Sequence, residues 1–252
     1  MIRTAHDDGI TTLTVDRSER RNAFDAETTR MLAEATEAAA GDPHLRALAL
    51  RGAGGNFSAG RDLKAIERGD EPRAEILGQH EDWVRIFHAL HRLPVPSVAV
   101  VQGYAVAGGF TLAMGCDFVL AERGARFGAL EMRNGFPAAV CTPVLARLIG
   151  PRLGLEFALF GDLVPAERLY AVGLINQLAD GDAALEKLSA EFLGRLAALD
   201  RDAVRLTRES FRAAENMPLD NALDMGKHLN QLVAASGWFA EGAARALAKD
   251  KR

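Results

Sequence analysis

Residues 97–115, Ser-Val-Ala-Val-Val-Gln-Gly-Tyr-Ala-Val-Ala-Gly-Gly-Phe-Thr-Leu-Ala-Met-Gly, decide the fold. The apolar run at 98–101 has the length and β-branched content of a buried strand. After it, Ala107-Gly108-Gly109 opens a second apolar segment, which predicts the first turns of a buried helix. Such a turn directs backbone N–H groups at one spot, at the positive end of the helix dipole. It either binds a ligand oxygen or only allows close packing of helix and strand, and this stretch alone leaves both interpretations open.

The composition is typical of a globular protein. The chain has 252 residues, of which 48% are hydrophobic and 25% charged, enough for one domain or one domain plus an appendage. A formal net charge of −4 gives no reason to expect nucleic acid or an anionic membrane as a partner. Without a signal-peptide core or an 18-residue apolar span, we expect a cytoplasmic protein. Cys116 and Cys141 have no C-x-x-C spacing, so neither a disulfide scaffold nor a metal site is expected.

The order of strand, glycine turn and helix occurs twice. Residues 45–50 predict a strand, the glycine-rich turn at 51–62 follows, and an amphipathic helix is expected at 72–92. Upstream, Asp25 is a suitable N-cap for a helix at 26–40. This alternation predicts an α/β core with ligand chemistry at the carboxyl ends of its strands.

Helices dominate after about residue 138. The last are expected at 201–215, 219–235 and 237–249, and large apolar side chains are frequent between Phe211 and Phe239. They are numerous for a thin helical tail. Packing on another subunit and packing on the α/β core are both consistent with this pattern.

The chemistry indicated by the residues is proton transfer beside an oxyanion hole. Two convergent backbone N–H groups stabilise negative charge on a carbonyl oxygen, and there are two glycine turns to supply them. Glu131 has apolar neighbours that would raise the pKa of its carboxyl, although composition alone favours a strand-end glutamate in a salt bridge. No G-x-G-x-x-G follows a strand, and Ser58 lacks the first glycine of G-x-S-x-G. A dinucleotide oxidoreductase and a serine hydrolase are therefore not indicated.

Three segments resemble motifs of the crotonase (enoyl-CoA hydratase/isomerase) superfamily. Residues 57–64, Phe-Ser-Ala-Gly-Arg-Asp-Leu-Lys, are similar to its F-x-A-G-x-D-[IL]-K segment. Residues 103–117 resemble its G-x-A-x-G-G-G-x-x-L-x-x-x-C-D segment, and residues 127–131 resemble F-x-x-P-E, with Leu130 in place of proline. The resemblance extends from about residue 10 to the C-terminus, in order and with nearly the family's spacing.

The resemblance implies both a fold and a substrate class. The fold would be a crotonase-like α/β spiral of ββα repeats at 1–195, containing the acyl-CoA site, with a helical trimerisation region at 196–252. The assembly would be a homotrimer or a dimer of trimers. The substrate would be an acyl-CoA thioester; because coenzyme A is part of that substrate, no separate cofactor is implied.

The resemblance also implies residue roles. The N–H groups of Arg61 and Gly108 would form the oxyanion hole, and Glu131 would be the acid/base. Other residues implied to contact the substrate lie on or directly after the two turns: Ala59, Asp62, Leu63, Gly109 and Thr111. The residues implied to bind the CoA phosphates are basic: Lys64, Arg20 or Arg21, and Lys249, the last from a neighbouring subunit. A solvated surface charge is the alternative for each basic residue.

The departures from the family pattern narrow the reaction. Thr111 stands where hydratases carry the first of two glutamates, Ala107 replaces the first glycine of the triplet, and the segment at 133–137 appears one residue short. One glutamate suffices to move a proton from C2 to C4 through a dienolate, which favours Δ3–Δ2 enoyl-CoA isomerisation. The alternatives are 2-enoyl-CoA hydration, with Glu131 alone activating water, and CoA binding without turnover.

Overall fold

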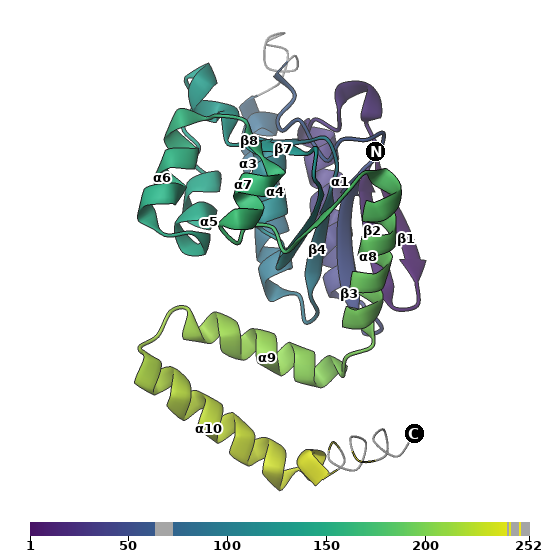
Figure 1. The fold of residues 1–252 in the computed structure, drawn as a ribbon, viewed down its shortest axis with the longest axis vertical. Coiled ribbons are helices and arrows are strands. Elements are labelled where there is room, and N and C mark those ends of the chain that lie inside the picture. Colours follow the sequence, from purple (N-terminus) through teal and green to yellow (C-terminus); the bar gives the residue numbers. More distant parts are fainter. Residues whose placement is uncertain (64–72, 241, 243–246, 248–252) are drawn as a thin grey trace. The chain divides into compact units, whose positions relative to one another are not determined.

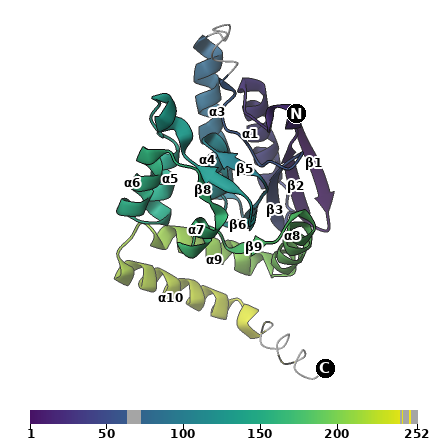
Figure 2. The same cartoon turned by 45° about the horizontal axis from the view of Figure 1, so that its top comes forward.

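The computed structural model describes residues 1–63, 73–240, 242 and 247. The chain divides into two compact units, Met1–Leu199 and Asp200–Arg252 (Figures 1 and 2). The boundary expected between residues 195 and 196 falls within the helix α8 (Asp182–Ala197). Lys64 and Lys249, two of the basic residues expected to bind CoA, lie outside the described residues.

The main sheet of the first unit has six strands in the order β1-β2-β3-β4-β6-β9. β1 pairs antiparallel with β2, and the remaining neighbours are parallel. The strands are β1 (Ile2–Asp7), β2 (Ile10–Val15), β3 (Ala47–Gly52), β4 (Ser97–Val101), β6 (Phe118–Glu122) and β9 (Gln177–Ala179). A largely parallel sheet places the carboxyl ends of its strands at one edge, where the connecting turns gather.

A second, smaller layer makes the fold a spiral. It contains β5 (Tyr104–Val106), β7 (Arg126–Gly128) and β8 (Val164–Pro165). Two isolated β-bridges extend this layer: Phe24 pairs with Arg61, and Ser58 pairs with Ala105. After β2, β3, β4 and β6 the chain therefore passes through this layer before it enters a helix. This is the repeated ββα spiral that the sequence resemblance implied.

The helices of the first unit are α1 (Ala26–Ala40), α3 (Arg73–Arg92), α4 (Gly108–Met114), α5 (Cys141–Leu148), α6 (Pro151–Phe160), α7 (Ala166–Ala171) and α8, with 3-10 helices η1 (Ser18–Arg20) and η2 (Leu130–Asn134). Among them, α1 and α3 agree closely with the helices expected at 26–40 and 72–92. Asp25 caps α1 as expected, its side chain accepting a hydrogen bond from the Thr28 N–H at 2.8 Å. An aspartate at this position satisfies one of the N–H groups that every helix start leaves without a partner.

Alternate residues of the central strands build two cores. In β3, Leu48 and Leu50 join the larger cluster with the side chains of α1, α3, α4 and α5, whereas Ala47 and Ala49 face α8 in a smaller cluster. Since successive strand residues point to opposite faces, this is the pattern of a sheet covered on both sides. Small alanines on one face leave room for Leu185 and Leu193 of α8.

The stretch at 97–115 is the buried centre of the fold. All five residues of β4 are buried, and so are residues 109–114 of α4. The predicted order of strand, glycine turn and buried helix is confirmed, with β5 inserted between them. The buried strand β4 and the buried residues of α4 therefore hold the partly exposed start of this helix in place.

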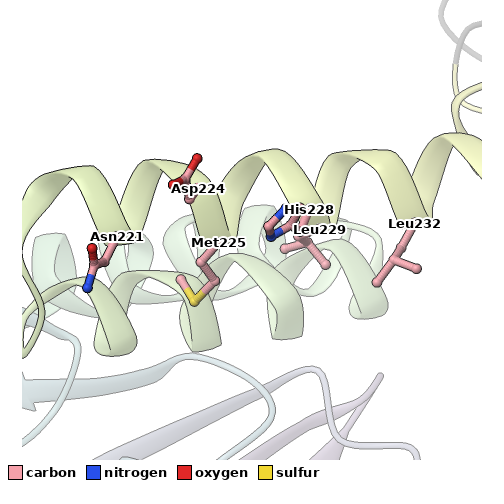
Figure 3. A pocket seen from close by; sticks show the side chains of 6 residues that line it. All are labelled: Asn221, Asp224, Met225, His228, Leu229 and Leu232. Atoms are coloured by element: carbon pink, nitrogen blue, oxygen red, sulfur yellow. The ribbon is translucent and has the colours of Figure 1, made fainter.

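The second unit contains α9 (Arg201–Ala214) and α10 (Leu219–Ala235). A shallow hollow of about 550 Å³ runs along α10, with Asn221, Asp224, Met225, His228, Leu229 and Leu232 at its surface (Figure 3). Leu219, Leu223 and Leu232 are each more than 60% exposed in the single chain. These side chains belong to the 211–239 region, for which the sequence is consistent with packing on another subunit or on the α/β core. Across the described part of the chain, no helix combines the length and the apolar character that crossing a membrane requires.

Candidate functional site

The two glycine turns lie directly against each other. A Cβ built on Gly60 of the first turn would lie 2.7 Å from the Ala107 Cβ and 3.1 Å from the Gly108 nitrogen of the second. A Cβ on Gly109 would lie 2.6 Å from the Ser58 carbonyl oxygen. Real Cβ atoms cannot approach so closely, so glycine is required on both sides of this contact. The sequence analysis placed the two turns in one site, and the structure brings their backbones together.

The first turn is held by the segment that precedes α1. The Phe24 N–H donates to the Gly60 carbonyl at 2.7 Å, and the Asp62 N–H donates to the Phe24 carbonyl at 2.9 Å. In such a parallel bridge the residue between the two bonded positions turns its own N–H and C=O to the other side. The Arg61 N–H is therefore directed away from Phe24.

The second turn is an unusual backbone conformation occupied by alanine. Ala107 has φ 49° and ψ −123°, a region that favours glycine. Its N–H donates to the Gly128 carbonyl at 2.7 Å, and its own carbonyl accepts from the Thr111 N–H at 3.0 Å. As the first residue of α4, Gly108 has no carbonyl partner for its N–H within the helix.

Trp83 of α3 is a neighbour of this turn that the sequence analysis did not single out. A Cβ on Gly108 would lie 3.0 Å from its Cζ2 atom. The half-buried indole meets Phe24 edge-on at 5.0 Å between ring centroids and stacks on Phe87 at 6.0 Å. The helical position of Trp83 gave no signal of this, since an aromatic residue on an amphipathic helix ordinarily belongs to the core.

Glu131 lies on the 3-10 helix η2 rather than at a strand end. Its Oε2 atom is buried and has no hydrogen-bond partner, and among the described residues it forms no salt bridge. Burial raises the pKa of the Glu131 carboxyl above its ordinary value. The salt-bridge interpretation of this glutamate is therefore wrong, and the carboxyl has the environment of a proton carrier.

The Cys141 thiol is near enough to Glu131 for the charge of the carboxylate to affect its pKa, and Thr111 is the residue at the position of a hydratase's first glutamate. Both side chains are almost fully buried. The Thr111 hydroxyl donates to the Ala107 carbonyl at 3.2 Å. Burial, with the nearby charge of Glu131, raises the pKa of the Cys141 thiol to about 12. Neither group ionises near neutral pH, so Glu131 is the titratable member of this trio.

The remaining candidates divide between the turns and the surface. Ala59, Asp62, Leu63 and Gly109 belong to the two turns, and Asp62 is buried against Arg17. Arg20 and Arg21 are exposed, and the Arg21 guanidinium lies 5.8 Å from the centre of the Tyr104 ring. Both arginines lie in the segment that leads to Phe24. They remain candidates for the CoA phosphates.

A hollow of about 350 Å³ lies beside η2. It is apolar and is lined by Met132, Pro137, Ala138, Ala139, Thr142, Pro143, Leu155, Ala158 and Leu159. None of the sequence-predicted site residues that the structure describes lines it. Within the described ranges there is also no group of three or more metal-ligating side chains. The candidate site is thus defined by the backbone of two turns and one carboxyl group.

The fold defines a class of protein, the crotonase-type ββα spiral. The sequence model of a family described as enoyl-CoA hydratase/isomerase matches residues 5–251. The chain belongs to this family, and it is an acyl-CoA enzyme of that type.

Relatives in the family have different named activities. The chain is 33% identical over 246 residues to the 1,2-epoxyphenylacetyl-CoA isomerase of Escherichia coli, covering 96% of this chain and 93% of the relative. It is 29% identical over 238 residues to the 2,3-dehydroadipyl-CoA hydratase of Escherichia coli, covering 94% and 91%. The crystal structure of an enoyl-CoA hydratase from Polaromonas sp. matches with a TM-score of 0.88 at 28% identity, covering 98% and 97%. Similarity of this order identifies the family and leaves the reaction open.

The backbone of Ala107 generates a stability prediction. An L-residue at this φ and ψ is strained by about 1–3 kcal/mol. Ala107→Gly removes this strain but increases the conformational entropy of the unfolded chain, and we expect the first effect on the free energy of unfolding to be the larger. We expect a gain of about 1 kcal/mol, measured by urea unfolding. The control is Ala113→Gly in the interior of α4, which should lose about 1 kcal/mol or more. Destabilisation by Ala107→Gly would show that the alanine methyl group contributes more than the strain costs.

Proposed function

We propose that this protein is an enoyl-CoA isomerase that moves a double bond between the Δ3 and Δ2 positions, with Glu131 as its acid/base. The observation that carries the proposal is the buried carboxyl oxygen of Glu131 that has no hydrogen-bond partner, while Thr111, which cannot act as a base near neutral pH, is the residue at the position of a hydratase's first glutamate. The contact between the two turns supports an oxyanion hole formed by the N–H groups of Arg61 and Gly108.

The reaction needs only these groups. The Glu131 carboxylate removes a proton from C2 of a 3-enoyl-CoA, and the electron pair moves onto the thioester oxygen. Two backbone N–H groups stabilise the resulting dienolate oxygen, a contribution often worth about 10²–10³-fold in kcat for each donor. The protonated carboxyl then returns the proton to C4. No water, metal or second base is consumed.

Hydration of 2-enoyl-CoA is the second candidate, favoured by relatives named as hydratases. Adding water requires a group that removes a proton from it and a group that protonates C2. Glu131 would have to serve both steps, with Thr111 holding the water. The Thr111 hydroxyl is already a donor to the Ala107 carbonyl at 3.2 Å, which leaves its oxygen as an acceptor for water.

Substituting the two side chains separates the candidates. We expect Glu131→Gln to lower turnover of 3-enoyl-CoA by about 10²–10⁴-fold, the usual value of general acid–base help, while acyl-CoA binding is retained. Thr111→Val should cost little if isomerisation is the reaction and more if the hydroxyl positions water. The measurement is turnover of 3-enoyl-CoA and 2-enoyl-CoA, following double-bond migration and hydration.

The control variant for charge is Glu156→Gln, because Glu156 is an exposed carboxyl paired with Arg168. It should leave turnover unchanged. Near wild-type activity of Glu131→Gln on every enoyl-CoA would identify another base. If the wild type turned over neither substrate, the binding protein without turnover would replace the proposal.

The raised pKa of Glu131 gives a pH prediction. The carboxyl must be ionised to accept the C2 proton, so kcat/KM should fall as pH drops through its pKa. Since burial raises that pKa, the midpoint should lie above about 4.3, the ordinary value for glutamate. A pH–rate profile with an acidic limb at or below that value would contradict the assignment.

We also propose a homotrimer or a dimer of trimers. The support is the exposure of apolar side chains in the second unit, including Phe211, Leu219 and Leu232. Exposed apolar residues at helical spacing mark an interface more often than a solvated face. Light scattering should give three or six times the mass of the chain. A stable monomer at micromolar concentration would refute the assembly and the contact expected from Lys249.

A further inference from the structure

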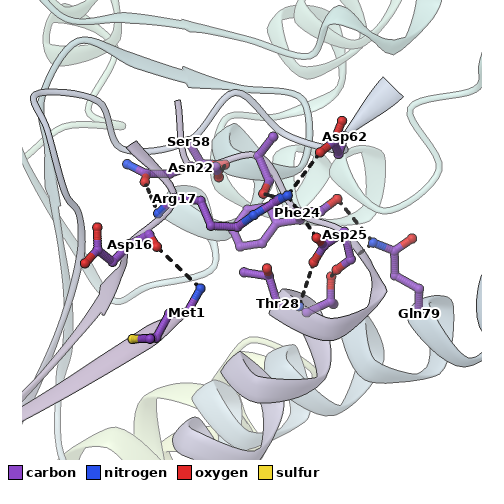
Figure 4. A network of polar contacts seen from close by, with 12 residues as sticks. Met1, Asp16, Arg17, Asn22, Phe24, Asp25, Thr28, Ser58, Asp62 and Gln79 are labelled. Atoms are coloured by element: carbon purple, nitrogen blue, oxygen red, sulfur yellow. Dashed lines mark hydrogen bonds and ion pairs between the residues drawn. The ribbon is translucent and has the colours of Figure 1, made fainter. Parts of the chain in front are cut away.

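Arg17 connects both sides of the backbone bridge that directs the Arg61 N–H. Its Nη2 atom lies 3.2 Å from Oδ2 of Asp62, the residue that follows Arg61 (Figure 4). Its Nη1 atom donates to the carbonyl of Ala23, the residue that precedes Phe24. The arginine side chain is only 17% exposed and that of Asp62 only 10%. One largely buried guanidinium therefore fastens the two segments that meet at the Phe24–Arg61 bridge.

The same loop is fixed from a second direction by Asn22. The Arg17 N–H donates to Asn22 Oδ1 at 2.9 Å, and the fully buried Asn22 amide donates to the Ala53 and Asn56 carbonyls at 2.8 and 2.7 Å. Ser58 completes the connection, because its hydroxyl accepts from the Gly60 N–H at 3.1 Å and donates to the Asn22 carbonyl. The first turn and the residue 17–25 segment thus form one hydrogen-bonded body.

The positive charge of Arg17 has a second effect, on the Asp62 carboxylate beside the proposed oxyanion donor. Asp62 is buried one residue from the proposed oxyanion donor, and a carboxylate there repels the negative charge that develops on an enolate oxygen. The guanidinium in contact with it opposes that repulsion. Asp25, the other carboxylate partner, lies 2.9 Å from the same Nη2 atom but belongs to the N-cap of α1.

We propose that Arg17 is a positioning residue for the oxyanion hole: it orients the Arg61 N–H through the Phe24–Arg61 bridge and neutralises Asp62. The inference rests on the proposed function, because it assigns Arg17 to the hole of that site. In this proposal Arg17 acts through Ala23 and Asp62, with which it makes its contacts, and not by touching the substrate. Its contribution should appear in the polarisation of the thioester and in kcat rather than in KM.

The experiment measures the hole without turnover. The probe is butanoyl-CoA labelled with ¹³C at the thioester carbonyl, whose infrared stretching frequency falls when two N–H groups polarise the carbonyl. In the wild type we expect a clear downshift on binding. Arg17→Met should lose much of it and lower kcat for 3-enoyl-CoA by about 10²-fold, the cost of a displacement near 1 Å, with KM little changed.

Three further variants separate positioning from fold stability. Arg17→Lys keeps the charge but not the two-armed contact, so it should be intermediate; it also covers the case in which Arg17→Met does not fold. Asp25→Asn removes one ion pair of Arg17 and keeps a good N-cap, so its melting temperature should fall while the carbonyl shift remains. Asp62→Asn placed in Arg17→Met should recover part of the shift, because the opposing charge is gone.

The outcomes distinguish this inference from the proposed function. A full carbonyl shift and normal kcat in folded Arg17→Met, or equal losses in Asp25→Asn, would overturn the role of Arg17 and leave the proposed function in place. An unshifted carbonyl in the wild type would overturn the oxyanion hole and Arg17 together. A shifted carbonyl without turnover of 3-enoyl-CoA would overturn the isomerase proposal, while the variants would still test Arg17 through the spectrum.

Discussion

The rest of the structure depends on the backbone-to-backbone contact between the turn at Gly60 and the turn at Ala107-Gly108-Gly109. At the distances found there, a single Cβ on Gly60 or Gly109 would collide with carbonyl, amide or methyl atoms that are themselves fixed by neighbouring strands. The spiral explains how two turns about fifty residues apart reach this proximity. Each turn follows a strand of the parallel sheet, and adjacent parallel strands end at the same edge.

Rigid packing around that contact gives the site its precision. α4 is too short to be stable alone, yet its residues from Gly109 to Met114 are buried and β4 beneath it is buried along its whole length. In the oxyanion hole that we propose, donors held by such a core would not need to reorganise when charge develops on a ligand oxygen, which is the main advantage of preorganised backbone N–H groups over water. Ala107 retains its strained conformation because the Gly128 carbonyl and the start of α4 hold it on both sides.

The central strand and helix and the first long helix could be predicted from the sequence, for physical reasons. The strand and helix at 97–115 carry long apolar runs, which predict buried elements. The helix α1 is preceded by a capping aspartate, which predicts where it begins. The three-residue strands β5 and β7 were not foreseen, because three residues are too few to show a period. Arg17 and Cys141 were missed as well: one lies in a polar connection and the other is a solitary cysteine, and only the fold brings them to Asp62 and to Glu131. The expected roles of the site residues came from the family motifs, because neither hydrophobic periodicity nor composition indicates what a residue does chemically.

The unpartnered carboxyl oxygen of Glu131 has a consequence for the acid/base role that we propose. No described residue donates a hydrogen bond to Oε2, and burial is the largest cause of the raised pKa of this carboxyl. In the proposed mechanism, a bound acyl chain would bury the carboxyl further, and further burial raises a carboxyl pKa. The proposed base would then hold a proton more tightly with substrate bound than with the site open to solvent.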